Sequence, residues 1–213
     1  MKKVLITAAA ILISTSSLFA YSTGSVVVAP ELGIGMAYPQ VTSAAKDDAG
    51  DDVKQKLGLY WSIGFTGSYF FNDNLALISG LTFEHNSTEL SWGDDGKFEF
   101  DQYRLVLPIG ARFHYSMFMV GGGLHLSTIV ANKSEMTDSQ GEKETEHFMG
   151  KAALGFFIDA GVDIKTADKN SLLVFLRLKD DLTYFYRQRG NDDFTGLRNL
   201  SLSLNASYSF QMN

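Results

Sequence analysis

The stretch Leu200–Phe210 reads LSLSLNASYSF, and its alternation decides the fold. Every even-numbered position from 200 to 210 is apolar or aromatic, and every odd-numbered position is Ser or Asn. Successive side chains of a β-strand point to opposite faces, so this period of two predicts a strand with one apolar and one polar face. The number of strands then depends on how often the same period recurs along the chain.

The alternation occurs eight times between residue 26 and the end of the chain, with strands of roughly 12 to 17 residues where globular strands average about five or six. Short connections are expected at residues 72–74, 116–117 and 166–170. Long, polar connections are expected at residues 39–55, 91–97, 132–146 and 187–195. An even number of long strands with alternating short and long connections predicts an all-β fold, an eight-stranded antiparallel up-and-down transmembrane β-barrel with its long loops on one rim.

Composition indicates which face of the barrel points outward. The polar face of the predicted strands is mostly Gly, Ser, Thr, Ala and Asn, whereas the exterior of a soluble lipocalin-like barrel, which is the alternative, should be rich in Lys and Glu. Small residues suit the crowded lumen of an eight-stranded barrel. The apolar face is therefore expected to contact lipid, which also accounts for 16 Phe, 9 Tyr and 2 Trp beside a mean hydropathy of only −0.02.

The aromatic residues also gather at the ends of the predicted strands, as they do at the two membrane–water interfaces of outer-membrane barrels. Near the short connections these are Tyr69, Phe71, Phe113, Tyr115, Phe118, Tyr208 and Phe210; near the long ones they are Tyr38, Phe83, Tyr103, Phe148, Tyr184 and Tyr186.

The first twenty residues have the layout of a secretory signal peptide. A basic start at Lys2 and Lys3 is followed by a short apolar run and by small residues up to Ala20. The alternative, a transmembrane helix, needs about 20 apolar residues, and this run is shorter. We expect residues 1–20 to be a cleaved signal peptide and residues 21–213 to form the barrel domain.

At this point the sequence resembles the small eight-stranded outer-membrane barrels of bacteria, of the OmpX, OmpA-barrel and opacity-protein type. The resemblance covers nearly all of residues 21–213, and Tyr103–Pro108 (YRLVLP) is similar to the fourth strand of this family. It implies an outer-membrane location in a diderm bacterium and contact with membrane lipid and a lipopolysaccharide-like glycolipid. The last strand resembles the family's C-terminal signal for the barrel-assembly machinery, carried here by Leu202, Leu204, Tyr208 and Phe210. The family usually ends on the aromatic residue, whereas this chain continues with residues 211–213.

Charged residues on the polar face should pair inside the lumen, because an unpaired charge there is costly. Asp159 and Arg177 are equidistant from the short connection around Asp168, so they should lie opposite each other. Glu84 and Arg104 are likewise equidistant from the middle of a long connection. Arg112 should face Gly121, which leaves room for its side chain. We expect these ion pairs to fill and close the barrel, the alternative being a gated ion path.

Candidate enzyme chemistry is limited to His125 and Ser127, which resemble the His-x-Ser of outer-membrane lipid A deacylases. A His that activates a nearby Ser is an acyl-transfer arrangement. However, Thr128 stands where that family has Asn, the motif lies far from the chain end, and both side chains should point into the lumen. We therefore expect no enzymatic activity and no catalytic residue.

Other partners are constrained by composition. The net charge of −6 gives no basic footprint for nucleic acid, and the absence of Cys excludes disulfides and thiolate metal sites. The acidic residues 47–52, together with Glu142, Glu144 and Glu146, do not fit the ligand spacing of an EF-hand, so solvated acidic loops are expected rather than a metal site. No cofactor is expected. The predicted function is a structural, adhesive or interaction role carried by surface loops that could contact an extracellular protein, the alternatives being a narrow porin-like channel and, third, a lipid A-modifying acyl hydrolase.

Overall fold

The computed structural model describes residues 21–41, 53–92, 96–138, 143–146, 152–167, 169–184, 186–189 and 194–212. The predicted signal peptide, residues 1–20, and the acidic residues 47–52 lie outside the described residues. Glu144 and Glu146 fall in a described strand, but their side chains and Glu142 do not belong to the described part of the chain.

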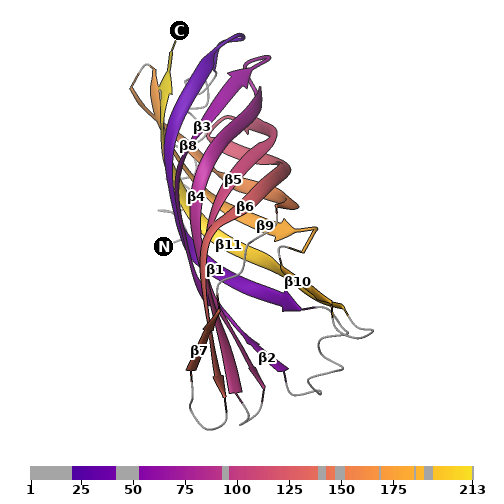
Figure 1. Cartoon of the computed structure of the whole chain (residues 1–213). Helices are drawn as coiled ribbons and strands as arrows, with labels where there is room; N and C mark the ends of the chain where they lie inside the picture. The colour runs from indigo at the N-terminus through magenta and orange to yellow at the C-terminus, as the bar shows by residue number, and fades with distance from the viewer. Residues whose placement is uncertain are drawn as a thin grey trace, which may run out of the picture.

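Eight long strands form a closed ring, which confirms the predicted all-β barrel (Figure 1). Their order around the ring is β1-β3-β4-β5-β6-β8-β9-β11, all neighbours are antiparallel, and β11 pairs with β1 to close it. The long strands are β1 (Val26–Val41), β3 (Gly58–Phe70), β4 (Leu75–Trp92), β5 (Gly96–Tyr115), β6 (Phe118–Asp138), β8 (Ala153–Ala167), β9 (Asn170–Asp181) and β11 (Phe194–Gln211).

Three four-residue strands add to the long-loop end of this ring. They are β2 (Val53–Lys56), which pairs with β4, β7 (Lys143–Glu146), which pairs with β6, and β10 (Tyr186–Arg189), which pairs with β11. Within the described ranges, no helix is long and apolar enough to cross a bilayer. We call the end that carries these added strands the long-loop end and the opposite end the short-turn end.

Tight turns close the short-turn end. Between β5 and β6 only two residues intervene, and Ser116 adopts a φ of 57° to make the reversal. Between β3 and β4 the side-chain oxygen of Asn72 accepts hydrogen bonds from the backbone N–H groups of Asn74 and Leu75. Asn side chains stabilise turns in this way because they replace a backbone acceptor.

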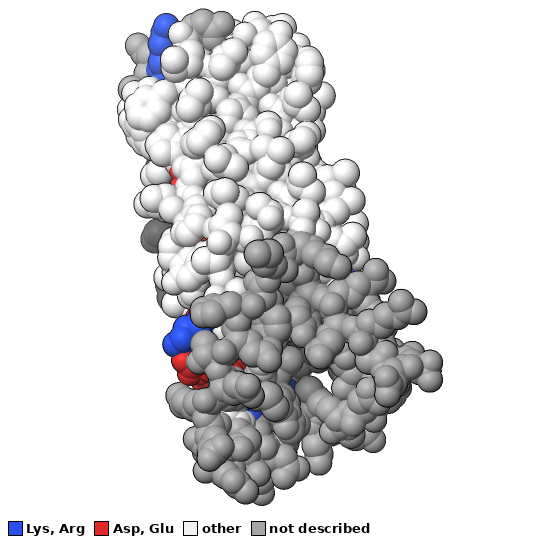
Figure 2. All heavy atoms as spheres, viewed as in Figure 1, with Lys and Arg blue, Asp and Glu red and all other residues white. Residues whose placement is uncertain are grey.

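The two faces of the wall divide as parity predicts. Along β1, Leu32 and Ile34 are 60% and 61% exposed, whereas Glu31 and Ala37 on the other face are at most 2% exposed. Figure 2 shows the result on one face as a broad, mostly white belt in which only small traces of Asp or Glu are visible, while the larger patches of charged atoms lie toward its two ends. The large apolar side chains therefore surround the barrel, and the small and charged ones fill its lumen.

The prediction of long loops at 91–97 and 132–146 is wrong in part, because the strands continue through most of these residues. β4 runs to Trp92, β5 begins at Gly96 and β6 reaches Asp138. The alternation persists beyond the lipid-facing rows: Leu90, Phe98 and Phe100 face one side and charged residues the other. Added strands β2 and β7 satisfy further backbone groups, so a five-stranded extension, β2-β4-β5-β6-β7, stands beyond the barrel at the lower end in Figure 1.

Candidate functional site

The lumen holds the unusual chemistry of this protein, because nine charged side chains among the described residues are buried on its lining. The same alternation that turns the apolar side chains outward turns these inward; four strands supply the acids and two supply the bases. These residues are Glu31, Glu84, Arg104, Arg112, Asp159, Asp163, Arg177, Lys179 and Asp181.

Four of them form what we call the central cluster: Glu31, Arg112, Asp159 and Arg177. Arg177 is bidentate toward Asp159, with Nε 2.8 Å from Oδ1 and Nη2 3.0 Å from Oδ2, and its Nη1 lies 2.8 Å from Glu31 Oε1. Arg112 Nη2 donates to Asp159 Oδ2 at 2.9 Å. Two carboxylates thus share two guanidinium groups, and the paired geometry is what allows charges to be buried at all.

Neighbouring side chains hold the central cluster in place. The guanidinium of Arg177 lies 5.2 Å from the ring centre of Phe157 and 5.0 Å from that of Phe175, within the range of a cation–π contact. Thr66 donates a hydrogen bond to Glu31 Oε2 at 3.0 Å. A Cβ on Gly121 would lie 2.7 Å from Arg112 Cγ, so this glycine provides the space in which the arginine lies, as expected.

Nearer the long-loop end lies the loop-side cluster of Glu84, Arg104, His125, Lys179 and Asp181. Arg104 Nη2 donates to Asp181 Oδ1 at 2.9 Å, and His125 Nε2 lies 2.9 Å from the same oxygen. Lys179 makes a salt bridge to Glu84, and its ammonium lies 5.3 Å from the ring centre of Tyr60. The cluster thus contains two acids, Glu84 and Asp181, and two bases, Arg104 and Lys179, beside the imidazole of His125.

The structure places the four residues proposed as luminal pairs as follows. Asp159 and Arg177 are direct register partners and make the salt bridge described above. Glu84 and Arg104 are also direct register partners, yet Glu84 pairs with Lys179 and Arg104 with Asp181. The expected pairing differs here because hairpin symmetry gives the neighbour in the wall, whereas long side chains can reach a partner across the lumen.

Three members of these clusters, Glu31, Lys179 and Asp181, were not expected as partners from the sequence. Glu31 and Lys179 do stand on the polar face of their strands, so parity signals that they point inward. Their partners lie on strands that are not adjacent in the ring, and the sequence carries no signal for contacts of that kind.

His125 and Ser127 both face the lumen, but different partners hold them. Ser127 accepts a hydrogen bond from Arg104 and donates one to the backbone oxygen of Ala153 at 3.3 Å. His125 contacts Asp181 through Nε2. An acyl-transfer site needs its base hydrogen-bonded to the nucleophile, whereas here a guanidinium binds the hydroxyl.

An apolar cluster covers the loop-side cluster on the side of the long loops. It consists of Leu90, Phe100, Ala153 and Leu197, with Phe98 and Ile129 packed against it. These residues come from β4, β5, β6, β8 and β11, or lie at their ends. Side chains from opposite parts of the wall therefore meet at this level as well.

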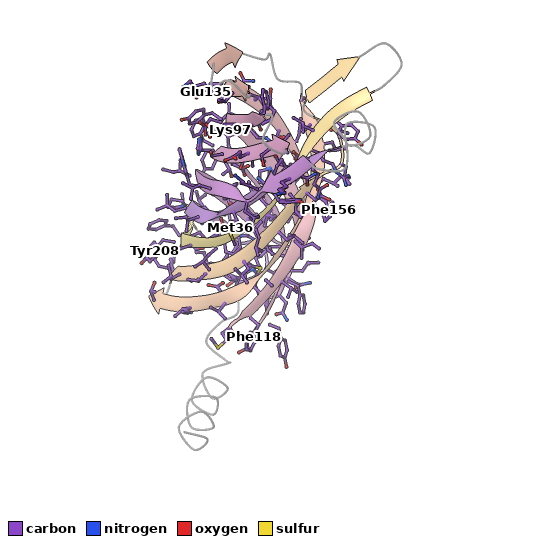
Figure 3. All side chains as sticks on the ribbon, turned by 90° about the horizontal axis from the view of Figure 1, so that it is seen from below. Met36, Lys97, Phe118, Glu135, Phe156 and Tyr208 are labelled. Carbon is purple, nitrogen blue, oxygen red and sulfur yellow. The ribbon has the colours of Figure 1, made fainter. Side chains whose placement is uncertain are left out.

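The outward face of the extension carries paired surface charges. Lys56 and Lys97 each lie 2.7 Å from a carboxylate, of Glu89 and Glu99 respectively, and Lys133 pairs with Glu135. Glu89, Glu99 and Glu135 form one row across β4, β5 and β6. The hydrogen bonds that Lys97 and Lys133 donate to Glu99 and Glu135 raise the pKa of both lysines, which keeps their ammonium groups charged. Figure 3 shows Lys97 and Glu135 together at the end opposite Phe118.

An aromatic group lies between this charged extension and the lipid-facing rows. Trp61, His85 and Tyr103 are register partners on β3, β4 and β5, and Phe83 lies beside them. His85 stacks on Trp61 with ring centres 5.5 Å apart, and its Nε2 is 3.3 Å from Asp101 Oδ1. Rings with a polar edge suit the boundary between an apolar layer and water.

The predicted assembly signal lies on the outer face of the closing strand. Leu202, Leu204 and Phe210 are exposed and Tyr208 is half-buried. The strand does not end at Phe210, because Gln211 pairs with Val27 and the Met212 N–H donates to Val26 O at 2.9 Å. The residues beyond the aromatic position therefore extend the seam between β11 and β1.

No group of three or more His, Asp or Glu residues in the described part of the chain could hold a metal ion. The features of the site are thus charge pairing inside, an apolar belt outside, and a charged extension at one end.

A closed ring of eight antiparallel strands with this division of faces is the fold of the small outer-membrane β-barrels. Among solved structures, the chain is similar to the outer membrane protein OprG from Pseudomonas aeruginosa, with a TM-score of 0.60 and 10% identity over 92% of this chain and 99% of that one. Neisserial surface protein A (NspA) matches with a TM-score of 0.44 and 14% identity over 88% of this chain and 97% of that one. Ail of Yersinia pestis matches with a TM-score of 0.40 and 15% identity over 88% and 99%. No family model and no curated protein matches the chain.

Proposed function

We propose that the protein is a small outer-membrane barrel of a diderm bacterium, exported through a cleaved signal peptide, whose lumen is closed by side chains and whose function is structural, adhesive or interactive. The observation that carries this proposal is the central cluster, in which two carboxylates and two guanidinium groups meet in the lumen. A pore for solutes needs a continuous hydrated path, and a buried, fully paired network in an eight-stranded ring leaves little room for one.

The energetic argument supports a closed resting state. Separating a buried ion pair leaves charges without partners, and breaking one typically costs about 3–5 kcal/mol. Asp159 is shared by Arg112 and Arg177, so opening the lumen at this level requires at least two such contacts to break together. The loop-side cluster and the apolar cluster lie further along the lumen, so a path through the barrel would have to pass them as well as the central cluster.

The proposed interaction surface is the long-loop end, which faces outward from the cell in this proposal. The extension β2-β4-β5-β6-β7 presents alternating Lys and Glu side chains there, and its apolar side packs inward. Partners would be membrane lipid and a lipopolysaccharide-like glycolipid around the belt, and an extracellular protein at the loops. The last strand, with Leu202, Leu204, Tyr208 and Phe210, would engage the barrel-assembly machinery. No nucleic acid, cofactor or metal is part of the proposal.

The test is conductance of the pure, refolded protein in planar bilayers. We expect negligible steady current across a range of voltages. Stable single-channel steps would contradict the closed lumen and support the alternative, a narrow porin-like channel. One observation favours that alternative: Asn205 Oδ1 and Ser207 Oγ on β11 are buried in the lumen without a hydrogen-bond partner, and such atoms usually bind water.

We also propose that the protein is not an enzyme, since Ser127 and His125 are held by different groups. Expression of the protein and of Ser127→Ala in a host, followed by mass spectrometry of lipid A, tests this. Unchanged acyl chains in both cases are expected. Loss of an acyl chain that depends on Ser127 would instead establish the acyl hydrolase.

A further inference from the structure

The chain preceding β1 folds back into the short-turn end of the barrel. The N–H of Gly24 donates to Phe70 O at 2.8 Å, the N–H of Ser25 donates to Ser22 O at 3.0 Å, and Gly24 has a φ of +84°. A positive φ of this size is readily adopted only by glycine, so Gly24 permits the reversal. This turn directs the side chain of Tyr21 toward the lumen.

The Tyr21 ring rests on two aromatic side chains. Its centre lies 4.0 Å from that of Phe70, with the planes 22° apart, and 5.4 Å from that of His114, whose ring meets it edge-on at 75°. Stacked and edge-to-face arrangements are the two geometries that aromatic pairs prefer. Phe70 is 1% exposed and His114 is 6% exposed, so both surfaces belong to the interior.

The Tyr21 hydroxyl reaches the opposite part of the wall. It donates to Asp163 Oδ2 at 2.7 Å and lies 2.9 Å from Ser171 Oγ. His114 Nδ1 is 3.2 Å from the same oxygen of Asp163, so the phenol and the imidazole share this carboxylate. Phe70, His114, Asp163 and Ser171 come from β3, β5, β8 and β9, and the ring of Tyr21 joins all four.

These four residues make a site that matches a phenol in shape and chemistry. Phe70 stacks on the face of the ring, His114 meets it edge-on, the Asp163 carboxylate accepts the hydrogen bond from the O–H, and the Ser171 hydroxyl lies within hydrogen-bond distance of the phenolic oxygen. Because Asp163 and Ser171 are buried, removing the phenolic hydroxyl takes one hydrogen-bond partner from each of them inside the lumen, and His114 remains beside Asp163.

Beyond this site, in the direction of the central cluster, lies Ser207 on β11. Ser209 is the register partner of Ser171, and Ser207 of both Leu173 and Glu31, so Ser207 stands one step deeper than the site. Ser207 is 2% exposed and its hydroxyl has no hydrogen-bond partner. Tyr21 therefore lies nearer the short-turn end than Ser207 does.

We propose that Phe70, His114, Asp163 and Ser171 form a binding site for a phenol, and that Tyr21 is its tethered ligand, a stopper that controls access to the lumen from the short-turn end. The stopper can leave and return by rotation about the turn at Gly24, without any change in the barrel wall. This inference concerns the barrel alone and does not depend on the proposed surface role.

The chain contains no cysteine, so a single thiol at Ser207→Cys reports on access without background. The refolded protein is exposed to methyl methanethiosulfonate, a small uncharged thiol reagent, and labelling is followed by mass spectrometry. With Tyr21 in place, we expect slow labelling. Tyr21→Phe keeps the stacking but loses the hydrogen bond to a charged group, and should label at least about tenfold faster. Tyr21→Ala should label faster still.

The matched control is Tyr69→Ala in the same Ser207→Cys background. Tyr69 lies at the same end of the barrel, but its side chain is on the outer face and 46% exposed, so labelling should not change. Every variant is first checked for the heat-dependent gel shift of a folded barrel. If Tyr21→Ala does not fold, Tyr21→Phe still decides the outcome. Equal labelling rates with Tyr and Phe at position 21 would overturn the proposal.

A second arm tests the chemical class of the ligand. Added p-cresol should slow labelling of the Tyr21→Ala, Ser207→Cys protein by occupying the site. Toluene, which has the same ring without the hydroxyl, should slow it less at equal concentration. Equal effects of the two compounds would contradict a site that recognises a phenol.

Discussion

Lys179 and Glu84 form a salt bridge across the full width of the barrel, because β9 and β4 stand opposite each other in the ring of eight strands. Both side chains are at least 93% buried, and the aromatic ring of Tyr60 lies beside the ammonium group. A salt bridge between opposite walls restrains the distance between those walls, which the pairing of neighbouring strands does not do.

Lys179→Met should therefore lower the free energy of unfolding by about 3–5 kcal/mol, because it leaves the Glu84 carboxylate buried and unpaired. Urea unfolding in detergent or lipid vesicles measures the change. Adding Glu84→Gln should restore a large part of the loss. The control is Lys56→Met, which removes the exposed pair with Glu89 and should cost no more than about 1 kcal/mol. Similar losses in the two single variants would contradict the assignment.

Arg177→Lys should destabilise the barrel although it preserves the charge. Arg177 binds both oxygens of Asp159 and one of Glu31 through three different nitrogens, which an ammonium cannot reproduce. We expect a loss of roughly 1–3 kcal/mol, the cost of leaving a buried acceptor unsatisfied. The temperature of the gel shift on heating in SDS reports it. Arg198→Lys serves as the control, because Arg198 is half-buried on the outward-facing side of β11 and belongs to neither luminal cluster; it should leave that temperature unchanged.

Gly121→Ala should weaken the central cluster without changing any of its charged residues. The added methyl would lie 2.7 Å from Arg112 Cγ and 2.9 Å from the backbone oxygen of Ala111, so the arginine must shift away from Asp159. Overpacking of this kind costs about 1–3 kcal/mol. Gly67→Ala is the matched control, since its nearest neighbour would be 3.8 Å away. If both variants unfold at the same urea concentration, the central cluster does not depend on the space that Gly121 leaves for Arg112.

Deletion of residues 211–213 should produce a barrel that folds but is less stable. It removes the Met212 N–H to Val26 O bond and the Gln211 side-chain bond to Ser25, at 2.9 Å each. Each hydrogen bond contributes about 0.5–1.5 kcal/mol, so a loss of roughly 1–3 kcal/mol is expected in refolding titrations. A barrel that unfolds at the same urea concentration without these residues would show that the seam gains nothing from them.

Much of the fold follows from the sequence because a two-residue period leaves little choice of face. The alternation in Leu200–Phe210 places Leu202 and Leu204 outside and Ser201 and Ser203 inside, as the structure has them. Register near a tight turn also follows from simple counting: Asp159 and Arg177 are equidistant from Asp168 and are direct partners.

The contacts that the sequence does not predict are those that cross the lumen. The counting that places Glu84 opposite Arg104 is correct for the backbone, but their ion pairs go to Lys179 and Asp181 on β9. Such contacts depend on the radius of the ring and on side-chain length, neither of which a period of two contains. The site of Tyr21 is a further case, since its partners lie on four strands separated widely in sequence.

Because the strands differ in length, the wall of the barrel is taller on one side than on the other. β6 continues from Thr128 to Asp138 beyond the point where its partner β8 begins, about 36 Å of extra strand at ~3.3 Å per residue. The wall at β4, β5 and β6 is therefore tall, and the wall at β8 and β9 is low. A molecule approaching the long-loop end meets the tall wall first, and the two sides of the barrel present different surfaces to their neighbours. Because its sides differ, the contacts of such a barrel depend on how it is rotated about its own axis. Neighbouring molecules can therefore favour one rotational orientation over another.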